Sequence, residues 1–481
     1  MLHRWYKPSV SKSQCSEIEL GHHQWGEFSM AAVKSDPVVQ GYSQLESGSM
    51  SLHPSGPYGA FVGIYDGHGG PNASEFIKDH LFEIVKRLMS DRGEMSGGVL
   101  DLSFLALDEQ YLQLVRNESE AFPSLLSAGS SCLVGVVIEG RVYIANVGDS
   151  RAVLARRHRP KQPVQLVREQ LTRLKLNVQR AGQKLLMPNL DEQLAFRYLD
   201  FPWQLEQPPR PPYLETKPLV QSFLNRNPYR RPGRNRHIEA IQLSTDHSAS
   251  LPSVEQELKE LHPRDHRIVT FNDYGDEICR VKGILPTSRS IGDVYLKSWE
   301  FNTRPELPRE YKVRVQFNKP IILHDPALFD QELLPEDKFI IFASPGLWSY
   351  VANEEAVDMV INSSQKGIAM KLLKKALKRR AWFTELKNLN TRKRICICDD
   401  ISVVVLFLDR KLIRGGRCKH LSLKSYEAST SQLHTGEAST SQSRTAGAST
   451  SQPHSTSQTR TTGASFSKSK SWPGFSRRDE T

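Results

Sequence analysis

Short apolar runs alternate along this chain with longer stretches of helical periodicity, and this alternation restricts the folds that the chain can adopt. The runs are rich in β-branched residues and have the length of strands in globular domains. They lie at 60–65, 131–148 (a hairpin with its turn at Glu139-Gly140), 151–156, 237–244, 339–344 and 401–409. Amphipathic stretches lie at 71–89, 102–117, 253–261, 353–362 and 366–381. The pattern predicts an α+β fold in which helices flank a sandwich of sheets.

A long basic segment separates two strands that we expect to be neighbours, at 151–156 and 237–244. Residues 157–236 between them hold 16 Lys or Arg against 6 Asp or Glu, and 11 of the 28 prolines. Part of this segment, 167–186, has a helical period. An irregular stretch of this length does not fit inside a compact core. We therefore predict a basic, proline-rich insertion at the tip of a hairpin.

The C-terminal residues 411–481 are also basic. After Lys424 the chain repeats variants of EASTSQ, with hardly any large apolar side chains. Segments of this composition bury too little apolar surface to offset the entropy of ordering, so we predict a disordered Ser/Thr-rich repeat tail. The insertion and the tail together carry more positive charge than the net +11 of the whole chain, so the body that carries the motifs is acidic.

The composition favours an intracellular protein. The chain has no run of about 18 apolar residues, and its start lacks the apolar region of a secretory signal. The six cysteines include no CxxC pair, which favours a reducing compartment. We therefore expect a cytoplasmic or nuclear protein, and a monomer.

The basic segments raise the question of anionic partners. Residues 225–236 read NRNPYRRPGRNR, but the sequence holds no RNP, zinc-finger or helix-turn-helix pattern, which argues against nucleic-acid binding. The same positive charge is compatible with peripheral contact with an acidic membrane leaflet.

Three aspartates stand at predicted strand ends: Asp66 in YDGHGG, Asp149 in NVGDSR and Asp399 in CDDISVV. Short carboxylates beside glycine turns suit hard divalent cations. Each motif alone is as readily explained as a turn, because Asp and Gly favour turns. Together, and with His68 beside Asp66, they predict a site for a divalent metal.

The motifs around these residues resemble those of the type 2C metal-dependent Ser/Thr protein phosphatases, in particular a plant group of this family. The matching stretches occur in the family's order across 26–410. They include FVGIYDGHGGPNAS (61–74), ANVGDSRAVLAR (145–156), QLSTDHSAS (242–250), RVKGILPTSRSIGDVYLK (280–297) and DDISVVVLFLD (399–409). The resemblance implies a central β-sandwich of two antiparallel sheets flanked by helices. It also implies hydrolysis of phosphoserine and phosphothreonine in phosphoprotein substrates by a metal-activated water.

The resemblance assigns roles to the candidate residues. It implies that Asp66 bridges two Mg²⁺ or Mn²⁺ ions, that the Gly67 carbonyl joins one of them, and that Asp399 joins the other. Asp149 corresponds to a residue that binds a weaker third ion. His68 would act as the general acid for the leaving group, which suits an imidazole near neutral pH. Asp293 in SRSIGD is expected to hold a turn.

Three positions depart from the family's pattern. Gln40 and Gly41 stand where the family has Glu and Asp, and Pro345 replaces a carboxylate that normally binds a metal. Mg²⁺ is often held by one or two carboxylates and water, so weaker binding is expected rather than none. Two functions therefore remain open: a working phosphatase, and a pseudophosphatase that binds phosphoproteins or other partners without turnover.

The sequence thus predicts three parts. Residues 1–25 form an N-terminal extension, 26–410 a phosphatase domain interrupted by the insertion 157–236, and 411–481 the tail. The plant relatives act partly at the plasma membrane, so the resemblance adds the inner face of that membrane as a location.

Overall fold

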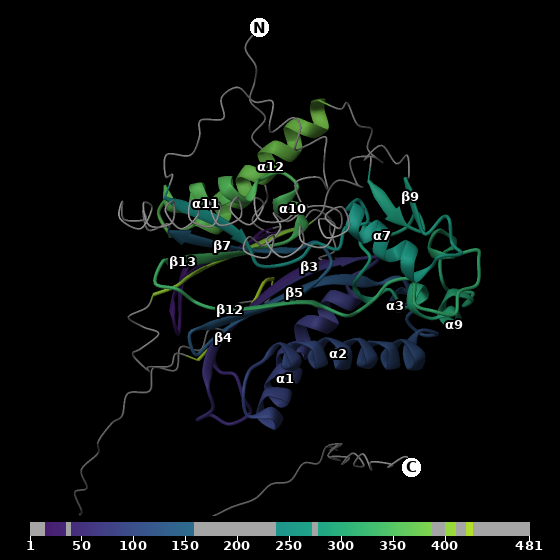
Figure 1. Cartoon of the computed structure of the whole chain (residues 1–481), viewed down its shortest axis with the longest axis horizontal. Helices are drawn as coiled ribbons and strands as arrows, with labels where there is room; N and C mark the ends of the chain where they lie inside the picture. Colours follow the sequence, from purple (N-terminus) through teal and green to yellow (C-terminus); the bar gives the residue numbers. More distant parts are fainter. Residues whose placement is uncertain are drawn as a thin grey trace, which may run out of the picture. The chain divides into compact units, whose positions relative to one another are not determined.

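The computed structural model describes residues 15–34, 40–157, 237–271, 278–386, 400–409 and 420–426. All of them belong to one compact unit, Met1–Ser429; a second unit, Thr430–Thr481, lies outside the described residues. The predicted insertion beyond Arg157 also lies outside them. The described chain forms two stacked antiparallel sheets with helices on both outer faces (Figure 1).

Each sheet is assembled from strands that are distant in the sequence, and every neighbouring pair is antiparallel. The first sheet has the order β1 (Cys15–His23), β2 (Gly26–Val33), β14 (Ile401–Phe407), β13 (Asp337–Ala343), β7 (Arg151–Arg157) and β8 (Ile238–Gln242). The second has the order β12 (Ala327–Glu332), β6 (Arg141–Val147), β5 (Gly129–Ile138), β4 (Tyr58–His68), β3 (Gly41–Ser49) and β15 (Leu421–Lys424), with β11 (Ile291–Gly292) paired to β5.

The main core lies between the two sheets. Leu133 of β5, Phe342 of β13 and Leu406 of β14 are fully buried there. Gly135 leaves room for an aromatic ring, because a Cβ at this position would lie 2.3 Å from the ring of Phe342. Alternate side chains of each strand therefore place one apolar face of each sheet in the interior.

Helices α1 (Asn72–Arg92) and α2 (Gly97–Glu118) cover the outer face of the second sheet. Their apolar residues recur at helical spacing, so that Ile77, Leu81 and Phe104 are fully buried against the strands. No helix in the described ranges is both long and apolar enough to span a membrane.

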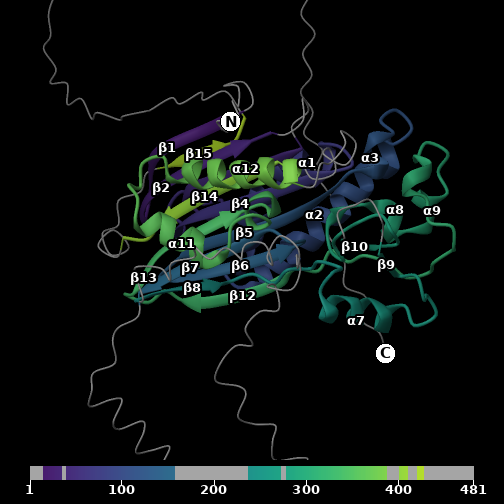
Figure 2. The ribbon, with the colours of Figure 1, turned by 90° about the horizontal axis from the view of Figure 1, so that it is seen from above.

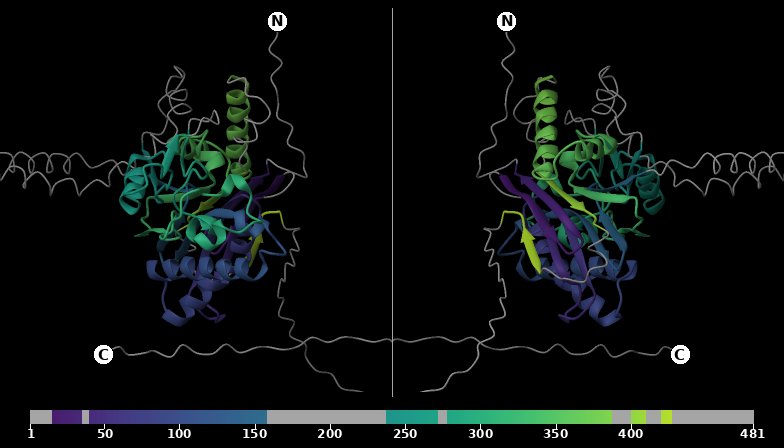
Figure 3. Two further views of the ribbon diagram at one scale, coloured as in Figure 1. Left: turned by 90° about the vertical axis from the view of Figure 1, so that its right-hand side faces the viewer. Right: turned by 90° about the vertical axis from the view of Figure 1, so that its left-hand side faces the viewer.

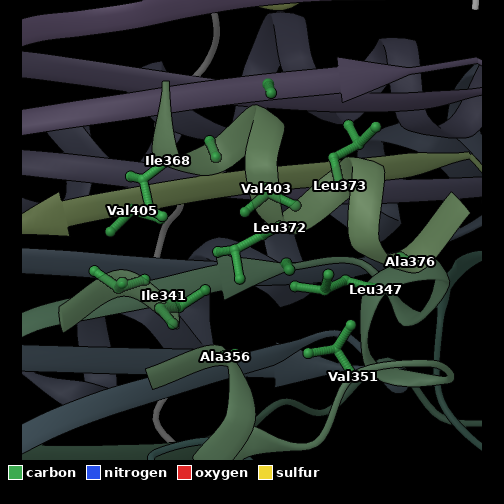
Figure 4. Packing of buried hydrophobic residues seen from close by; sticks show 14 of the residues in the cluster. Ile341, Leu347, Val351, Ala356, Ile368, Leu372, Leu373, Ala376, Val403 and Val405 are labelled. Carbon is green, nitrogen blue, oxygen red and sulfur yellow. The ribbon is translucent and has the colours of Figure 1, made fainter. Parts of the chain in front are cut away.

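The outer face of the first sheet is covered by α10 (Pro345–Trp348), α11 (Asn353–Ile361) and α12 (Ile368–Leu386) (Figure 2). Figure 4 shows the buried side chains of this layer, with Leu372 and Leu373 of α12 close to Val403 of β14.

Shorter elements pack beside the sandwich around a third core that includes Tyr295 and Phe301. They are α3 (Ser124–Ser127), α7 (Pro252–Leu261), β9 (Val269–Phe271), β10 (Cys279–Val281), α8 (Val294–Lys297), α9 (Trp299–Asn302) and η3 (Arg309–Tyr311). Figure 1 shows α3, α7, β9 and α9 grouped together at one end of the sheets.

Most predicted elements are confirmed, including the α+β sandwich of two antiparallel sheets. The hairpin turns at Glu139 and Gly140, which have φ values of 49° and 77°, as a tight hairpin turn requires. Strands β7 and β8 pair as expected, with Leu154 opposite Ile241. Strand β4 is longer than predicted and continues through the turn-like Asp66 and Gly67 to His68, because β3 pairs with it as far as Asp66 and β5 as far as His68.

Two segments that the predicted domain boundaries exclude form edge strands. Strand β1 lies within the predicted extension 1–25 and pairs with β2. Strand β15 lies within the predicted tail 411–481 and pairs with β3 (Figure 3). The backbone N–H of Ser43 donates to Ser425 Oγ over 2.9 Å, which ties the end of β15 to the sheet. The boundaries at 25 and 411 therefore omit parts of both sheets.

Candidate functional site

The structure brings four of the five predicted site residues, Asp66, Gly67, His68 and Asp149, to one end of the second sheet. Asp66 and His68 lie at the end of β4, where they pair with Ser131 and Gly129 of β5. Asp149 lies in the turn after β6, which is the other neighbour of β5. The negative charge of Asp149 acts on the His68 ring, so these side chains share one electrostatic environment.

A carboxylate from the first sheet reaches the same place. Asp400, just before β14, accepts hydrogen bonds at Oδ2 from the backbone N–H groups of Gly41 (2.9 Å) and Gln40 (3.1 Å). A Cβ at Gly41 would lie 3.4 Å from this oxygen and 3.6 Å from Asp66 Oδ1. Asp66 of the second sheet and Asp400 of the first sheet therefore both lie close to Gly41. Asp399 lies outside the described residues, so its predicted role stays a prediction.

The backbone around Gly67 leaves no space for a side chain. A Cβ at Gly67 would lie 2.2 Å from the carbonyl oxygen of Gln40. That oxygen accepts hydrogen bonds from the Gly67 N–H (3.1 Å) and from Ser74 Oγ of α1 (2.5 Å). The segment that carries the altered positions 40 and 41 is therefore fixed against β4 and α1.

Pro345 begins the short helix α10, a position that proline tolerates because no helical partner for its N–H is needed. The preceding Ser344 accepts a hydrogen bond from the Ser402 N–H (3.0 Å) and donates to the Asp400 carbonyl (3.1 Å). The buried loop is thus held against Asp400, but Pro345 offers the site no side-chain ligand.

His68 contacts a buried carboxylate that we had expected only to hold a turn. Its Nε2 lies 2.7 Å from Asp293 Oδ2; the His68 side chain is 32% exposed and that of Asp293 is 0% exposed. Burial on its own lowers the pKa of His68, but the charges of Asp293 and Asp149 reverse this shift and hold the pKa above its ordinary value. The sequence offered one sign of this role: Asp293 follows a glycine in SRSIGD, as Asp149 does in NVGDSR.

The turn that carries Asp149 depends on Gly148, whose φ is 98°. Its N–H donates to Nδ1 of the buried His247 over 3.2 Å. A Cβ at Gly148 would lie 2.3 Å from Cβ of Ser131, the residue that pairs with Asp66. The turn is therefore packed directly against the strand beside Asp66.

Gly148→Ala is expected to destabilise the protein by about 1–3 kcal/mol, because alanine disfavours this φ and its Cβ overlaps Ser131. Urea unfolding measures the change, with Gly93→Ala as control, since Gly93 also has a positive φ (80°) but a Cβ there meets no atom within 4 Å. Equal losses in the two variants would show that packing against Ser131 contributes nothing.

Two buried histidines, His23 and His247, should make the free energy of unfolding fall in acid. Burial lowers the pKa of His23 to about 4 and, aided by the charge of Arg289, that of His247 to about 3. An unfolded histidine titrates near 6.5 (roughly), so the unfolded chain binds more protons and stability falls as the pH drops below that value. We expect a loss of roughly 2 kcal/mol per histidine between about pH 6.5 and 5, measured by urea unfolding. A constant free energy of unfolding over this range would contradict it.

The donors at this end of the sandwich suit a weakly held hard cation. Within the described residues, no group of three or more His, Cys, Asp or Glu side chains is arranged to hold a metal. Asp66 and Asp149 are partly exposed carboxylates, and Mg²⁺ binds such oxygens together with water. The residues present therefore fit Mg²⁺ or Mn²⁺ held by few protein ligands.

The chain matches a known protein family over more than half of its length. The family model described as "Protein phosphatase 2C" matches residues 43–180 and 234–382. The chain is 36% identical over 426 residues to "Probable protein phosphatase 2C 38" of Arabidopsis thaliana, covering 85% of this chain and 90% of the relative. It is 34% identical over 414 residues to "Probable protein phosphatase 2C 28" of Oryza sativa subsp. japonica, covering 85% and 82%. A serine-threonine phosphatase 2C structure from Toxoplasma gondii aligns with a TM-score of 0.46 and 13% identity, covering 82% of this chain and 99% of that one.

Proposed function

Because the chain belongs to the protein phosphatase 2C family and is similar in sequence to plant members, we propose that it is a metal-dependent protein Ser/Thr phosphatase. Its substrates would be phosphoserine and phosphothreonine in proteins. One observation supports this most strongly: Asp66, His68 and Asp149 of one sheet meet Asp400 of the other at a single end of the sandwich.

The cofactor would be Mg²⁺ or Mn²⁺, with two ions per domain. Asp66, the Gly67 carbonyl and Asp399 would hold these ions, and Asp149 a weaker third. When bound, such cations activate water as a nucleophile and neutralise charge on a phosphoryl group. The fit of these donors rests on the partly exposed carboxylates at the ends of β4 and β6.

His68 is suited to donate a proton to the seryl or threonyl oxygen that leaves. Its raised pKa keeps the ring protonated more readily near neutral pH. A general acid must lie close to the leaving oxygen, and His68 is two residues from Asp66 on the same strand. The strand thereby sets the spacing between the cation ligand and the proton donor.

A second candidate is a pseudophosphatase, which Gln40, Gly41 and Pro345 favour. Gly41 has no side chain, and Pro345 is packed into the start of α10 without a metal donor. Such a protein would bind phosphoproteins or other partners without turnover.

Phosphate release from a phosphothreonine peptide by the full chain in Mn²⁺ tests the two candidates. We expect release that excess EDTA abolishes. Peptide binding without release, followed by fluorescence anisotropy, would identify a pseudophosphatase. Absence of both binding and release would contradict both functions.

For the rest of the protein we propose that the domain extends from β1 to β15, with the insertion between β7 and β8. We propose a monomer in the cytoplasm or nucleus, with peripheral contact at the inner face of the plasma membrane through the basic insertion and tail. The charge of these segments supports the membrane contact. We propose no nucleic-acid partner.

A further inference from the structure

The carboxylate of Asp293 is fully buried and is directed at the His68 ring. Besides the 2.7 Å contact with His68 Nε2, Asp293 Oδ2 accepts a hydrogen bond from Ser290 Oγ over 2.6 Å. A buried carboxylate is costly unless it is hydrogen-bonded. Both contacts are made by Oδ2, whereas Oδ1 is buried and has no hydrogen-bond partner in the described part of the chain, so His68 and Ser290 offset the cost of burial only in part.

Asp293 stands where a helix N-cap would stand, but its side chain does not cap the helix. It precedes α8, has a left-handed backbone with a φ of 48°, and makes no capping hydrogen bond to that helix. The carboxylate of an aspartate at a helix N-cap usually accepts a hydrogen bond from a backbone N–H group in the first turn of the helix. The carboxylate of Asp293 instead contacts Nε2 of His68.

Strand β5, which pairs with β4 beside His68, has a glycine at the position where this carboxylate lies. Gly129 of β5 pairs with His68, and a Cβ at Gly129 would lie 2.0 Å from Asp293 Oδ2. The Asp293 N–H also donates to the carbonyl of Ala128 over 2.9 Å. The start of β5 therefore holds both the backbone and the side chain of Asp293 beside the ring.

The ion pair between Asp108 and Lys297 holds the turn 290–293 in place through hydrogen bonds to its backbone. Asp108 of α2 accepts hydrogen bonds from the Gly292 N–H (3.0 Å) and from Lys297 Nζ (2.6 Å). Lys297 Nζ also donates to the carbonyl of Ser290 over 2.9 Å. Both charged groups are largely buried, so α2 anchors the turn that presents Asp293.

We propose that Asp293 is a positioning residue that fixes the orientation and tautomer of the His68 ring; the proposal rests on the phosphatase function above. A carboxylate that binds one ring nitrogen leaves the other nitrogen to face the reaction, as in hydrolases in which an aspartate orients a histidine. Asp293 itself does not touch the substrate.

The test compares two substrates whose leaving groups differ. A seryl or threonyl alkoxide needs a proton to leave, whereas the p-nitrophenolate of p-nitrophenyl phosphate is stable without one. In Mn²⁺, Asp293→Asn should lower kcat on a phosphothreonine peptide about 10- to 100-fold, with little change in KM, and change kcat on p-nitrophenyl phosphate less than about 3-fold. Equal losses on both substrates, or none, would overturn the proposal.

Asp337→Asn is the matched control, because Asp337 is also a buried carboxylate and pairs with Arg156 over 2.6 Å. This variant should affect both substrates alike, as expected for a loss of stability.

A second measurement does not depend on turnover. In ¹⁵N-labelled protein, at a pH high enough for the His68 ring to be neutral, ring nitrogen correlations should show that its tautomer changes in Asp293→Asn and stays unchanged in Asp337→Asn. An unchanged His68 tautomer in Asp293→Asn would overturn the positioning role even in a chain without activity. Absence of wild-type turnover would instead contradict the proposed enzymatic function.

Discussion

Asp66→Asn is expected to lower Mn²⁺-dependent phosphate release by more than about 100-fold. Changing a residue that merely supports a metal ligand costs about 10- to 100-fold, so changing Asp66, which we propose to hold the cations directly, should cost more. Asparagine keeps the size of the side chain but removes the charge from the point where Asp66 faces Asp400. Initial rates on a phosphothreonine peptide across a range of Mn²⁺ concentrations measure the change.

Asp101→Asn is the control for this prediction, since Asp101 is exposed on α2 and the same chemical change occurs away from the site. The two variants should unfold at similar temperatures. If Asp66→Asn retained the wild-type rate at saturating Mn²⁺, the metal-dependent mechanism would be wrong.

The second large effect is expected from introducing carboxylates at two positions where the family resemblance implies them. Gln40→Glu combined with Pro345→Asp should lower the Mn²⁺ concentration for half-maximal activity at least about tenfold, because Mg²⁺ and Mn²⁺ prefer anionic oxygen ligands. An aspartate at the first position of α10 is also compatible with the helix N-terminus. The dependence of the rate on Mn²⁺ concentration measures this shift.

Gly41 is left unchanged in this variant for a structural reason. A Cβ there would lie 3.1 Å from Asp400 Cβ, and a carboxylate at this position would oppose that of Asp400. The control is Gln365→Glu with Pro308→Asp, which makes the same two changes at exposed positions. An equal response of both double variants would show that the added charge, and not the site, is responsible.

Sequence patterns predicted the parts of the fold that depend on local periodicity. The hairpin at Glu139-Gly140 and the strands on either side of the insertion followed from alternation and turn residues. The grouping of Asp66, His68 and Asp149 was also predictable, because their motifs end strands β4 and β6, which run in the same direction on either side of β5.

Contacts between distant segments were not predictable in this way. The pairing of β15 with β3 joins residues more than 370 positions apart. The local pattern in LSLK does not indicate which strand it pairs with. The contact between His68 and Asp293 spans 225 positions and depends on the absence of a side chain at Gly129. Asp293 therefore looked like a turn residue until the packing around it was known.

Binding of Mn²⁺ to the full chain, followed by electron paramagnetic resonance of the free ion, tests most directly whether this end of the sandwich holds a divalent cation. The free-ion signal should fall as wild-type protein or Asp101→Asn is added, and it should persist with Asp66→Asn. A signal that wild type leaves unchanged, or that Asp66→Asn lowers to the same extent, would show that Asp66 holds no metal.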